Sequence, residues 1–254
     1  GGFTFPAGSA IIGLFLEWGG GRAQVRPALR FYPEGIPILR FGPRGPQKSA
    51  GRRRGKVVDK TETETKGRSA ACQRLLDSPV IAAVKDEAGL DAALQSECGA
   101  VFLLFGSAAE VGRLVRRTRD AGKLAIVHID LVEGLSCREA AVDTLAALCR
   151  PDGVISTRPP LVRRARHLGF LTVQRVFMLD SLALKTLPGQ LNVGKPDFIE
   201  ILPGIIPRVI GEVAAATSTP VIAGGLIRYK DEVMAAMRAG AAAVSTSSPP
   251  VWDM

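Results

Sequence analysis

Residues 220–248 hold two short apolar runs, and each run ends in a loop of small residues. The first reads Pro220-Val221-Ile222-Ala223-Gly224-Gly225, and the second reads Ala243-Val244-Ser245-Thr246-Ser247-Ser248. Glycine lets backbone N–H groups approach an anion closely, and serine and threonine hydroxyls add hydrogen-bond donors. Two such loops, separated by one helical segment, are typical of the phosphate site after strands 7 and 8 of a (β/α)8 barrel. They therefore predict six more strands earlier in the chain.

The chain between residues 79 and 254 repeats strand and helix patterns at an interval of about 23 residues, which suits one strand, one helix and their loops. The expected strands are 80–84, 101–105, 124–128, 153–156, 171–175, 198–201, 221–223 and 243–245. Helix signals lie between them, for example the N-cap candidate Asp86. Eight repeats indicate a TIM barrel over residues 79–254. Only residues 249–254 follow the eighth strand, so we expect its helix to be truncated or missing, with its place open to a helix around residues 68–76.

Residues 1–78 have a different composition from the rest of the 254-residue chain. Glycine, proline and arginine recur there without helical or strand periodicity, and 14 Lys/Arg stand against 6 Asp/Glu. Such a segment buries too little apolar surface to offset its ordering entropy, so a disordered basic extension is expected. An RNA-binding arm and a mis-set start are the alternatives. Residues 79–254 hold 19 Lys/Arg and 18 Asp/Glu, so the net charge of +9 says little about the barrel itself.

The remaining composition favours a reduced, cytoplasmic protein. The four cysteines form no C-x-x-C pair and no histidine cluster accompanies them, so neither structural zinc nor any other metal site is expected. No apolar run reaches the roughly 20 residues that span a bilayer, which argues against a membrane partner. The oligomeric state stays open, with a homo-oligomer among the alternatives.

Polar residues follow the expected strands at their carboxyl ends, where a barrel binds its ligand. His128 and Asp130 are two residues apart and should point to one side of a strand. Arg175 lies on an apolar strand, where a charge needs a partner. Glu200 ends another strand and could bind hydroxyl groups or form a salt bridge with Arg175 or Arg158. We expect these side chains to contact or support the polar part of a phosphorylated ligand.

Two arginine clusters lie on the predicted helices. Arg158, Arg163, Arg164 and Arg166 form one, and Arg113, Arg116, Arg117 and Arg119 form the other. Each is compatible with an RNA surface or with a solvated helix face. The cluster from Arg158 to Arg166 is the better candidate for RNA contact.

Six ordered motifs resemble one family, the glycerol-3-phosphate-responsive antiterminators of bacterial glycerol uptake operons. They are His128–Gly134, Gly153–Arg158, Val173–Asp180, Lys195–Gly204, Val221–Arg228 and Ala243–Ser247. The resemblance covers about residues 79–252 and does not reach residues 1–78. It implies a barrel that binds glycerol-3-phosphate and leader mRNA, lets transcription pass a terminator, and uses neither catalysis nor a cofactor.

The resemblance and the residues agree on the ligand. A phosphate held by Gly224, Gly225, Ser245, Thr246 and Ser247 would leave two hydroxyls directed toward the barrel centre. Ligand binding would order the loops at the strand ends and favour a conformation that binds RNA more tightly. The alternative is an isomerase or aldolase acting on a phosphorylated triose or sugar, with Lys85 as a Schiff-base amine and Glu200 as a base, because this fold hosts many such enzymes.

Overall fold

The computed structural model describes residues 60–253, with side chains from residue 66 onward. Residues 1–59 of the extension predicted for residues 1–78 lie outside the described residues. The strands are β1 Val80–Val84, β2 Ala100–Leu103, β3 Leu124–His128, β4 Gly153–Ser156, β5 Leu171–Phe177, β6 Phe198–Leu202, β7 Val221–Gly224 and β8 Ala243–Thr246. The helices are α1 Lys60–Asp77, α2 Glu87–Gln95, α3 Val111–Asp120, α4 Glu139–Leu148, α5 Pro159–His167, α6 Ser181–Gly194, α7 Pro207–Ala216 and α8 Lys230–Arg238, with short 3-10 helices η1 Ile129–Leu131 and η2 Pro249–Val251.

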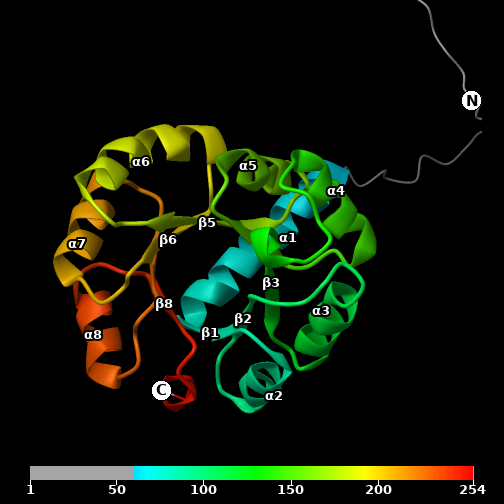
Figure 1. Ribbon diagram of the computed structural model, residues 1–254, viewed down its shortest axis with the longest axis horizontal. Helices are drawn as coiled ribbons and strands as arrows, with labels where there is room; N and C mark the ends of the chain where they lie inside the picture. The colour runs from blue at the N-terminus through cyan, green and yellow to red at the C-terminus, as the bar shows by residue number, and fades with distance from the viewer. Residues whose placement is uncertain (1–59, 254) are drawn as a thin grey trace, which may run out of the picture. The chain divides into compact units, whose positions relative to one another are not determined.

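The eight strands form one closed parallel barrel in chain order, with β1 paired to β8. Figure 1 shows α2 to α8 arranged around this barrel. The predicted TIM barrel is therefore confirmed, and each expected strand is present within a few residues of its predicted bounds. The Asp86 cap is confirmed as well, since its carboxylate accepts a hydrogen bond from the Gly89 amide at 2.7 Å.

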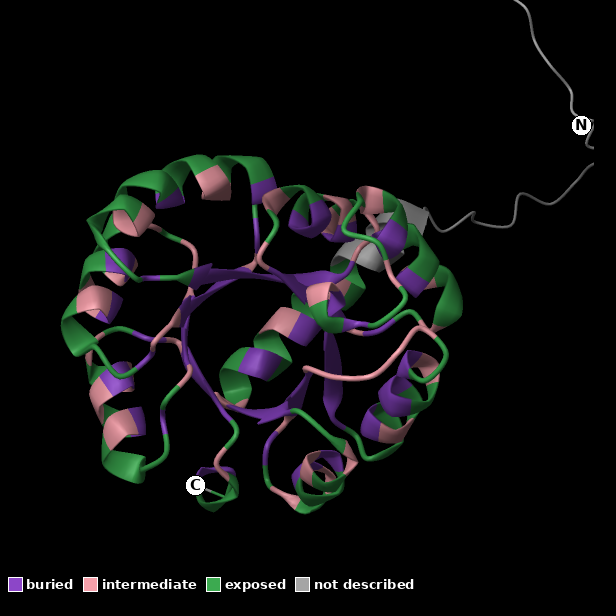
Figure 2. Ribbon diagram, viewed as in Figure 1, coloured by how far each residue is buried: buried purple, intermediate pink, exposed green. Residues whose placement is uncertain are grey.

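Apolar side chains fill the barrel on both sides of its wall. Inside, Phe102, Phe198 and Ile155 belong to a cluster that is fully buried or nearly so. Outside, two further clusters pack the strands against the surrounding helices. Figure 2 shows the strands as a continuous buried ring. Burial on both faces explains why the strands read as apolar runs without alternation.

Helix α1 corrects the boundary that we placed at residue 78. Residues 60–77 are helical rather than part of an extension, and Leu75 is fully buried in the cluster inside the barrel. Arg74 donates a hydrogen bond to the Gly122 carbonyl just before β3. Figure 1 shows α1 lying across one end of the barrel. The helix expected around residues 68–76 is thus confirmed, although it is longer than expected. It covers the end of the barrel where the strands begin.

After β8, the described residues form the 3-10 helix η2. Trp252 follows it and is buried, and its indole N–H donates to the Thr246 carbonyl at 2.9 Å. Trp252 thereby fastens this segment to the end of β8. None of the helices that the structure describes is both long and apolar enough to cross a membrane.

Candidate functional site

A pocket of about 230 Å³ opens at the carboxyl ends of β7 and β8. It is lined by Ala83, Lys85, Leu104, Arg175, Glu200, Leu202, Gly225, Leu226, Ile227, Arg228, Ser245, Thr246 and Ser247. Four of the five residues predicted to bind phosphate therefore share one hollow. The fifth, Gly224, is buried and does not line it. The pocket is smaller than those that hold drug-sized molecules, which are about 300–1,000 Å³, and suits a small metabolite.

Gly224 leaves room for the polar side chains behind the pocket because it has no Cβ atom. A Cβ atom at this position would lie 2.5 Å from Glu200 Oε1 and 2.7 Å from Ser245 Oγ. Only glycine therefore lets β6, β7 and β8 bring these polar groups together behind the pocket. Gly225 follows with a φ of 76°, a left-handed conformation that glycine adopts without strain.

Hydroxyl groups connect the loops after β7 and β8 to each other. Thr246 donates its hydroxyl proton to the Ile227 carbonyl at 2.6 Å, and Ser248 donates to the Arg228 carbonyl at 3.0 Å. A hydroxyl has one proton, so the Thr246 side chain holds the loops in place and cannot also donate to a ligand. Ser247 is exposed at the pocket and its hydroxyl forms no hydrogen bond with the described residues.

Backbone amides supply further donors at the pocket. In the described part of the chain, the amides of Gly225, Leu226 and Ser247 have no hydrogen-bond acceptor. Leu226 also has a positive φ of 65°, which is uncommon for a residue with a branched side chain. Successive amides in turns of this kind can form a concave site for an anion.

Two cationic side chains line the same pocket. Lys85 follows β1 and Arg228 follows β7, and both are exposed. Neither forms an ion pair with any carboxylate of residues 66–253. Arg228 was missed as a site residue because sequence alone does not show that its loop turns back over the pocket. Lys85 was considered only as a Schiff-base amine.

Arg175 and Glu200 form a buried ion pair at the floor of the pocket. Their side chains are neighbours in the register of β5 and β6, and Arg175 Nε lies 2.5 Å from Glu200 Oε2. Ser245 Oγ donates to the other carboxylate oxygen, also at 2.5 Å. The predicted partnership of Arg175 with Glu200 is confirmed, whereas Arg158 takes no part in it. The pair supplies a polar floor whose formal charges cancel.

His128 and Asp130 do not line this pocket. A 3-10 helix begins at Ile129, so Asp130 does not continue the strand as we assumed, but His128 Nδ1 still lies 4.0 Å from Asp130 Oδ2. Asp130 accepts hydrogen bonds from the Ser156 hydroxyl at 2.8 Å and from the Thr157 amide at 2.7 Å, and thus ties η1 to the end of β4. Burial, with the nearby Arg175 charge, lowers the His128 pKa to about 4, so the imidazole is neutral near pH 7. Its Nδ1 has no hydrogen-bond partner among the described residues.

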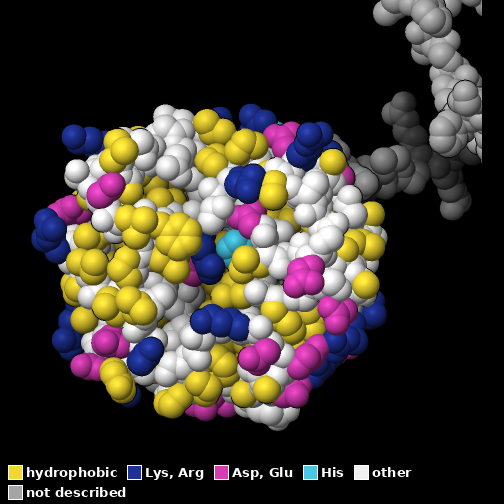
Figure 3. Space-filling view, viewed as in Figure 1, with side chains coloured by type: hydrophobic (Ala, Val, Ile, Leu, Met, Phe, Trp, Pro, Cys, Tyr) yellow, Lys and Arg dark blue, Asp and Glu magenta, His cyan; other side chains and the backbone are white. Residues whose placement is uncertain are grey.

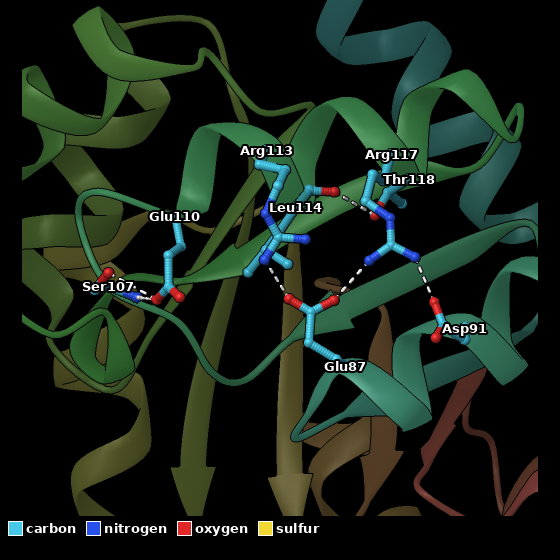
Figure 4. A network of polar contacts seen from close by, with 8 residues as sticks. All are labelled: Glu87, Asp91, Ser107, Glu110, Arg113, Leu114, Arg117 and Thr118. Carbon is cyan, nitrogen blue, oxygen red and sulfur yellow. Dashed lines mark hydrogen bonds and ion pairs between the residues drawn. The ribbon is translucent and has the colours of Figure 1, made fainter.

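The arginine clusters on α3 and α5 face carboxylates on the neighbouring helices. Figure 4 shows Arg113 and Arg117 of α3 bridged by Glu87 of α2, with Asp91 on the other side of Arg117. On α5, Arg163 pairs with Glu139 at 2.7 Å. These pairs are at least one-third exposed, and such pairs add little stability. Paired side chains of this kind fit the solvated-face alternative for most of the two clusters.

The four arginines chosen as RNA contacts do not share one surface. Arg164 pairs with Asp143 at 2.5 Å, and Arg158 lines a separate hollow at the start of α5. Arg163 and Arg166 instead line a basic groove, a hollow of about 600 Å³ on α1, α5 and α6. Arg68, His167 and Lys195 also line the basic groove. Asp197 pairs with Arg166 at 2.6 Å and lies 3.8 Å from Arg68, and Glu139 pairs with Arg163.

In the described part of the chain, no three His, Cys, Asp or Glu side chains gather in a way that could hold a metal ion. The pocket therefore offers amides, hydroxyls, cations and one neutralised carboxylate as its recognition groups. This set suits a small anion that also carries hydroxyl groups.

Comparison with known proteins identifies the family of this chain. A family model described as glycerol-3-phosphate responsive antiterminator matches residues 80–252. A curated relative, the uncharacterized protein YgcP of Escherichia coli (strain K12), is 39% identical over 180 residues, which is 71% of this chain and 94% of the relative.

Crystal structures extend the comparison. The glycerol uptake operon antiterminator regulatory protein of Listeria monocytogenes is 34% identical, with a TM-score of 0.67, over 69% of this chain and 95% of that chain. A glycerol uptake operon antiterminator-related protein of Thermotoga maritima is 29% identical, with a TM-score of 0.62, over 70% of this chain and 99% of that chain.

A more distant likeness shows the fold alone. Deoxyribose phosphate aldolase from Aeropyrum pernix is 15% identical, with a TM-score of 0.54, over 73% of this chain and 94% of that chain. The family match and the crystal structures, in contrast, agree with the resemblance carried by the six motifs. This chain belongs to the glycerol-3-phosphate responsive antiterminator family of regulatory proteins.

Proposed function

We propose that this chain binds glycerol-3-phosphate in the pocket at β7 and β8 and uses the bound state to control antitermination at a leader mRNA. One observation carries the ligand assignment. The amides of Gly225, Leu226 and Ser247 and the cations Lys85 and Arg228, all without acceptors or ion pairs among the described residues, converge on one small pocket.

The charges of the pocket suit a phosphate dianion. The Arg175–Glu200 pair is neutral as a unit, which leaves Lys85 and Arg228 as two formal positive charges. A charge-assisted hydrogen bond contributes about 1.5–3 kcal/mol, so two cations with several amides provide a strong phosphate clamp. The glycerol hydroxyls would then meet the Arg175 and Glu200 side chains at the pocket floor.

Asp130 and His128 take supporting roles in this proposal. Asp130 already accepts several hydrogen bonds from β4 and its loop, and His128 stands close enough to Arg175 for the guanidinium charge to affect its pKa. Both side chains would therefore hold the floor in place rather than contact the ligand.

The ligand would act by favouring one arrangement of the loops. Thr246 and Ser248 already connect the loops after β7 and β8, so a phosphate that bridges both loops would stabilise the joined form. If that form binds RNA more tightly, ligand and RNA must raise each other's affinity by the same factor. The basic groove on α1, α5 and α6 is the surface that we propose for RNA, because its four Lys and Arg side chains exceed the two carboxylates that pair with three of them. Lys195 forms no ion pair with the described residues.

RNA binding measured with and without glycerol-3-phosphate tests this proposal. The probe is a hairpin transcribed from the leader of a glycerol-catabolism operon, titrated with the full chain at low salt. We expect the ligand to raise RNA affinity, and the Arg228→Ala variant to lose this response while the Arg238→Ala variant keeps it. Arg238 is an arginine at the far end of α8 and does not line the pocket. Absence of RNA affinity, or affinity indifferent to the ligand, would contradict the proposal.

A matched pair of variants tests the RNA surface separately. Lys195→Ala should weaken RNA binding and reduce its salt dependence, because one phosphate contact is lost. Arg208→Ala should leave both unchanged, since Arg208 is 81% exposed on α7, outside the groove. Equal effects of the two variants would move the RNA surface elsewhere.

The enzyme alternative has one point in its favour, since Lys85 does line the pocket. A Schiff-base lysine is normally desolvated, however, and Lys85 is exposed. Glu200 has one oxygen bound by Arg175 and the other by Ser245, which leaves it poorly placed as a base. These contacts support binding over chemistry. Turnover of a triose phosphate that the Lys85→Ala variant loses would favour the enzyme.

A further inference from the structure

The pocket at β7 and β8 has an apolar side, which the proposed ligand contacts have not used. Ala83 of β1 and Leu104, which follows β2, line the pocket there, and together we call them the apolar wall. Ala83 belongs to the cluster inside the barrel, and the half-buried Leu104 packs against that cluster. The Leu104 amide donates to the Val84 carbonyl at 2.9 Å, which fixes the wall beside the end of β1.

The polar groups of the pocket floor lie across the barrel from the apolar wall. In a closed barrel of eight strands in chain order, β1 and β2 stand opposite β5 and β6, which carry Arg175 and Glu200. On β8, next to β1, the Ser245 hydroxyl is turned to Glu200 and donates to its carboxylate. Figure 3 shows that cationic and hydrophobic side chains meet around the centre of the barrel.

Arg175 keeps donors for a ligand although it is only 9% exposed. Its hydrogen bond and its ion pair with Glu200 use Nε, and they are its polar contacts with the described residues. A guanidinium carries four more N–H groups on its two terminal nitrogens, and these remain for a ligand. A hydroxyl group in the pocket therefore finds donors on the floor, whereas the methyl groups of the wall offer it neither a donor nor an acceptor.

This contrast bears on the shape of the proposed ligand. The middle carbon of glycerol-3-phosphate carries a hydroxyl and a hydrogen, and the two enantiomers exchange their positions. If the phosphate and the terminal hydroxyl are both held, the middle hydroxyl points to the floor in one enantiomer and toward the wall in the other. A hydroxyl turned to the wall loses its hydrogen bonds with water and gains none in return.

We propose that the apolar wall makes the pocket selective for one enantiomer of glycerol phosphate, with Leu104 as the residue that determines this specificity. This specificity rests on the proposed function, in which the loops after β7 and β8, with Lys85 and Arg228, hold the phosphate. Lys85 also follows β1, but it is exposed, so its ammonium group serves the phosphate at the pocket mouth rather than a hydroxyl at the wall.

Calorimetric titration of the full chain with each enantiomer of glycerol phosphate tests this inference. We expect one enantiomer to bind at least about tenfold more tightly than the other. Leu104→Asn places a shorter, hydrogen-bonding side chain in the wall, so the weaker enantiomer should gain affinity and the ratio should fall at least about threefold. Ala83→Ser adds a hydroxyl to the same wall with little added volume, and it serves as a second variant in case Leu104→Asn fails to fold.

Leu168→Asn is the matched control, because Leu168 is also half-buried but packs against a cluster outside the barrel and does not line the pocket. It should keep the wild-type ratio. Equal affinities of the wild-type chain for the two enantiomers would overturn the inference and leave the proposed function standing. So would an unchanged ratio in a folded wall variant, or a control whose ratio falls as much. Binding of neither enantiomer would overturn the proposed function together with this inference.

Discussion

Replacing Arg175 with Met removes one half of the ion pair at the pocket floor and leaves the other half in place. Glu200 is 1% exposed and its partner Arg175 is 9% exposed, so the carboxylate has little contact with water to offset the lost guanidinium. Among the described residues, the Ser245 hydroxyl would be the remaining hydrogen-bond donor to the carboxylate. Breaking a buried pair in this way costs about 3–5 kcal/mol, because an uncompensated charge stays buried.

That cost is large against the total stability of the chain. Native domains are stable by about 5–15 kcal/mol, and 1 kcal/mol shifts the melting temperature of a domain of this size by about 2–4 °C. The Arg175→Met variant should therefore melt about 6–20 °C below the wild-type chain, as measured by circular dichroism. Chemical denaturation at neutral pH should give the corresponding loss of unfolding free energy.

The double variant Arg175→Met with Glu200→Gln separates charge from packing. The introduced amide would be neutral and would still accept the Ser245 hydrogen bond, so most of the lost stability should return. Recovery of at least half of the loss is the expected result. A single variant that loses less than about 1 kcal/mol, or a double variant no more stable than the single one, would refute the buried-pair argument.

Three further predictions concern residues around the pocket. Lowering the pH from about 7.5 to about 5 should remove about 2 kcal/mol of unfolding free energy through His128. The pKa of His128 is about 4 in the folded chain and about 6.5 in the unfolded chain, so over this range the unfolded chain binds the proton and the folded chain does not. The His128→Asn variant, measured by denaturant unfolding at both pH values, should lack this loss. Gly224→Ala should cost about 1–3 kcal/mol in denaturant unfolding, since its Cβ would lie 2.5 Å from Glu200 Oε1, whereas Gly189→Ala on α6, with open space around it, should not destabilise. Thr246→Val should cost about 1–3 kcal/mol by leaving the Ile227 carbonyl without its donor, and an unchanged melting temperature would show that the two loops are held by other contacts.

The barrel could be predicted from the sequence because its signal repeats. Each strand is buried on both faces and gives an apolar run, and eight runs at a regular interval specify one topology. Single elements carried weaker signals. Helix α1 buries little more than Ala71 and Leu75 among the residues whose side chains are described, so its amino-terminal turns gave no apolar face to read.

The site could be predicted only in part. The small residues after β7 and β8 carry a local signal, and the pairing of Arg175 with Glu200 follows from the cost of burying a lone charge. The place of Arg228 depends on how its loop folds back, and the place of Asp130 depends on a 3-10 helix that strand periodicity does not reveal. Tertiary contacts, not residue spacing, decide such positions.

The two arginine clusters show the same limit. Their spacing on α3 and α5 was visible, but whether they face RNA or carboxylates depends on the neighbouring helix. Glu87 and Glu139 occupy the facing positions and pair with Arg113 and Arg163. The number of arginines on one helix therefore overestimates the net positive charge of the surface, because carboxylates of the neighbouring helix neutralise part of it.

Calorimetric titration of the full chain with glycerol-3-phosphate, glycerol and inorganic phosphate tests the central claim most directly. Glycerol-3-phosphate should bind most tightly, phosphate weakly and glycerol not measurably, because the amides and cations hold the phosphate while the floor adds the hydroxyl contacts. Arg228→Ala should weaken binding about tenfold or more, and Arg238→Ala should not. Equal heats for all three compounds, or wild-type affinity in the Arg228→Ala variant, would contradict a phosphate site at β7 and β8.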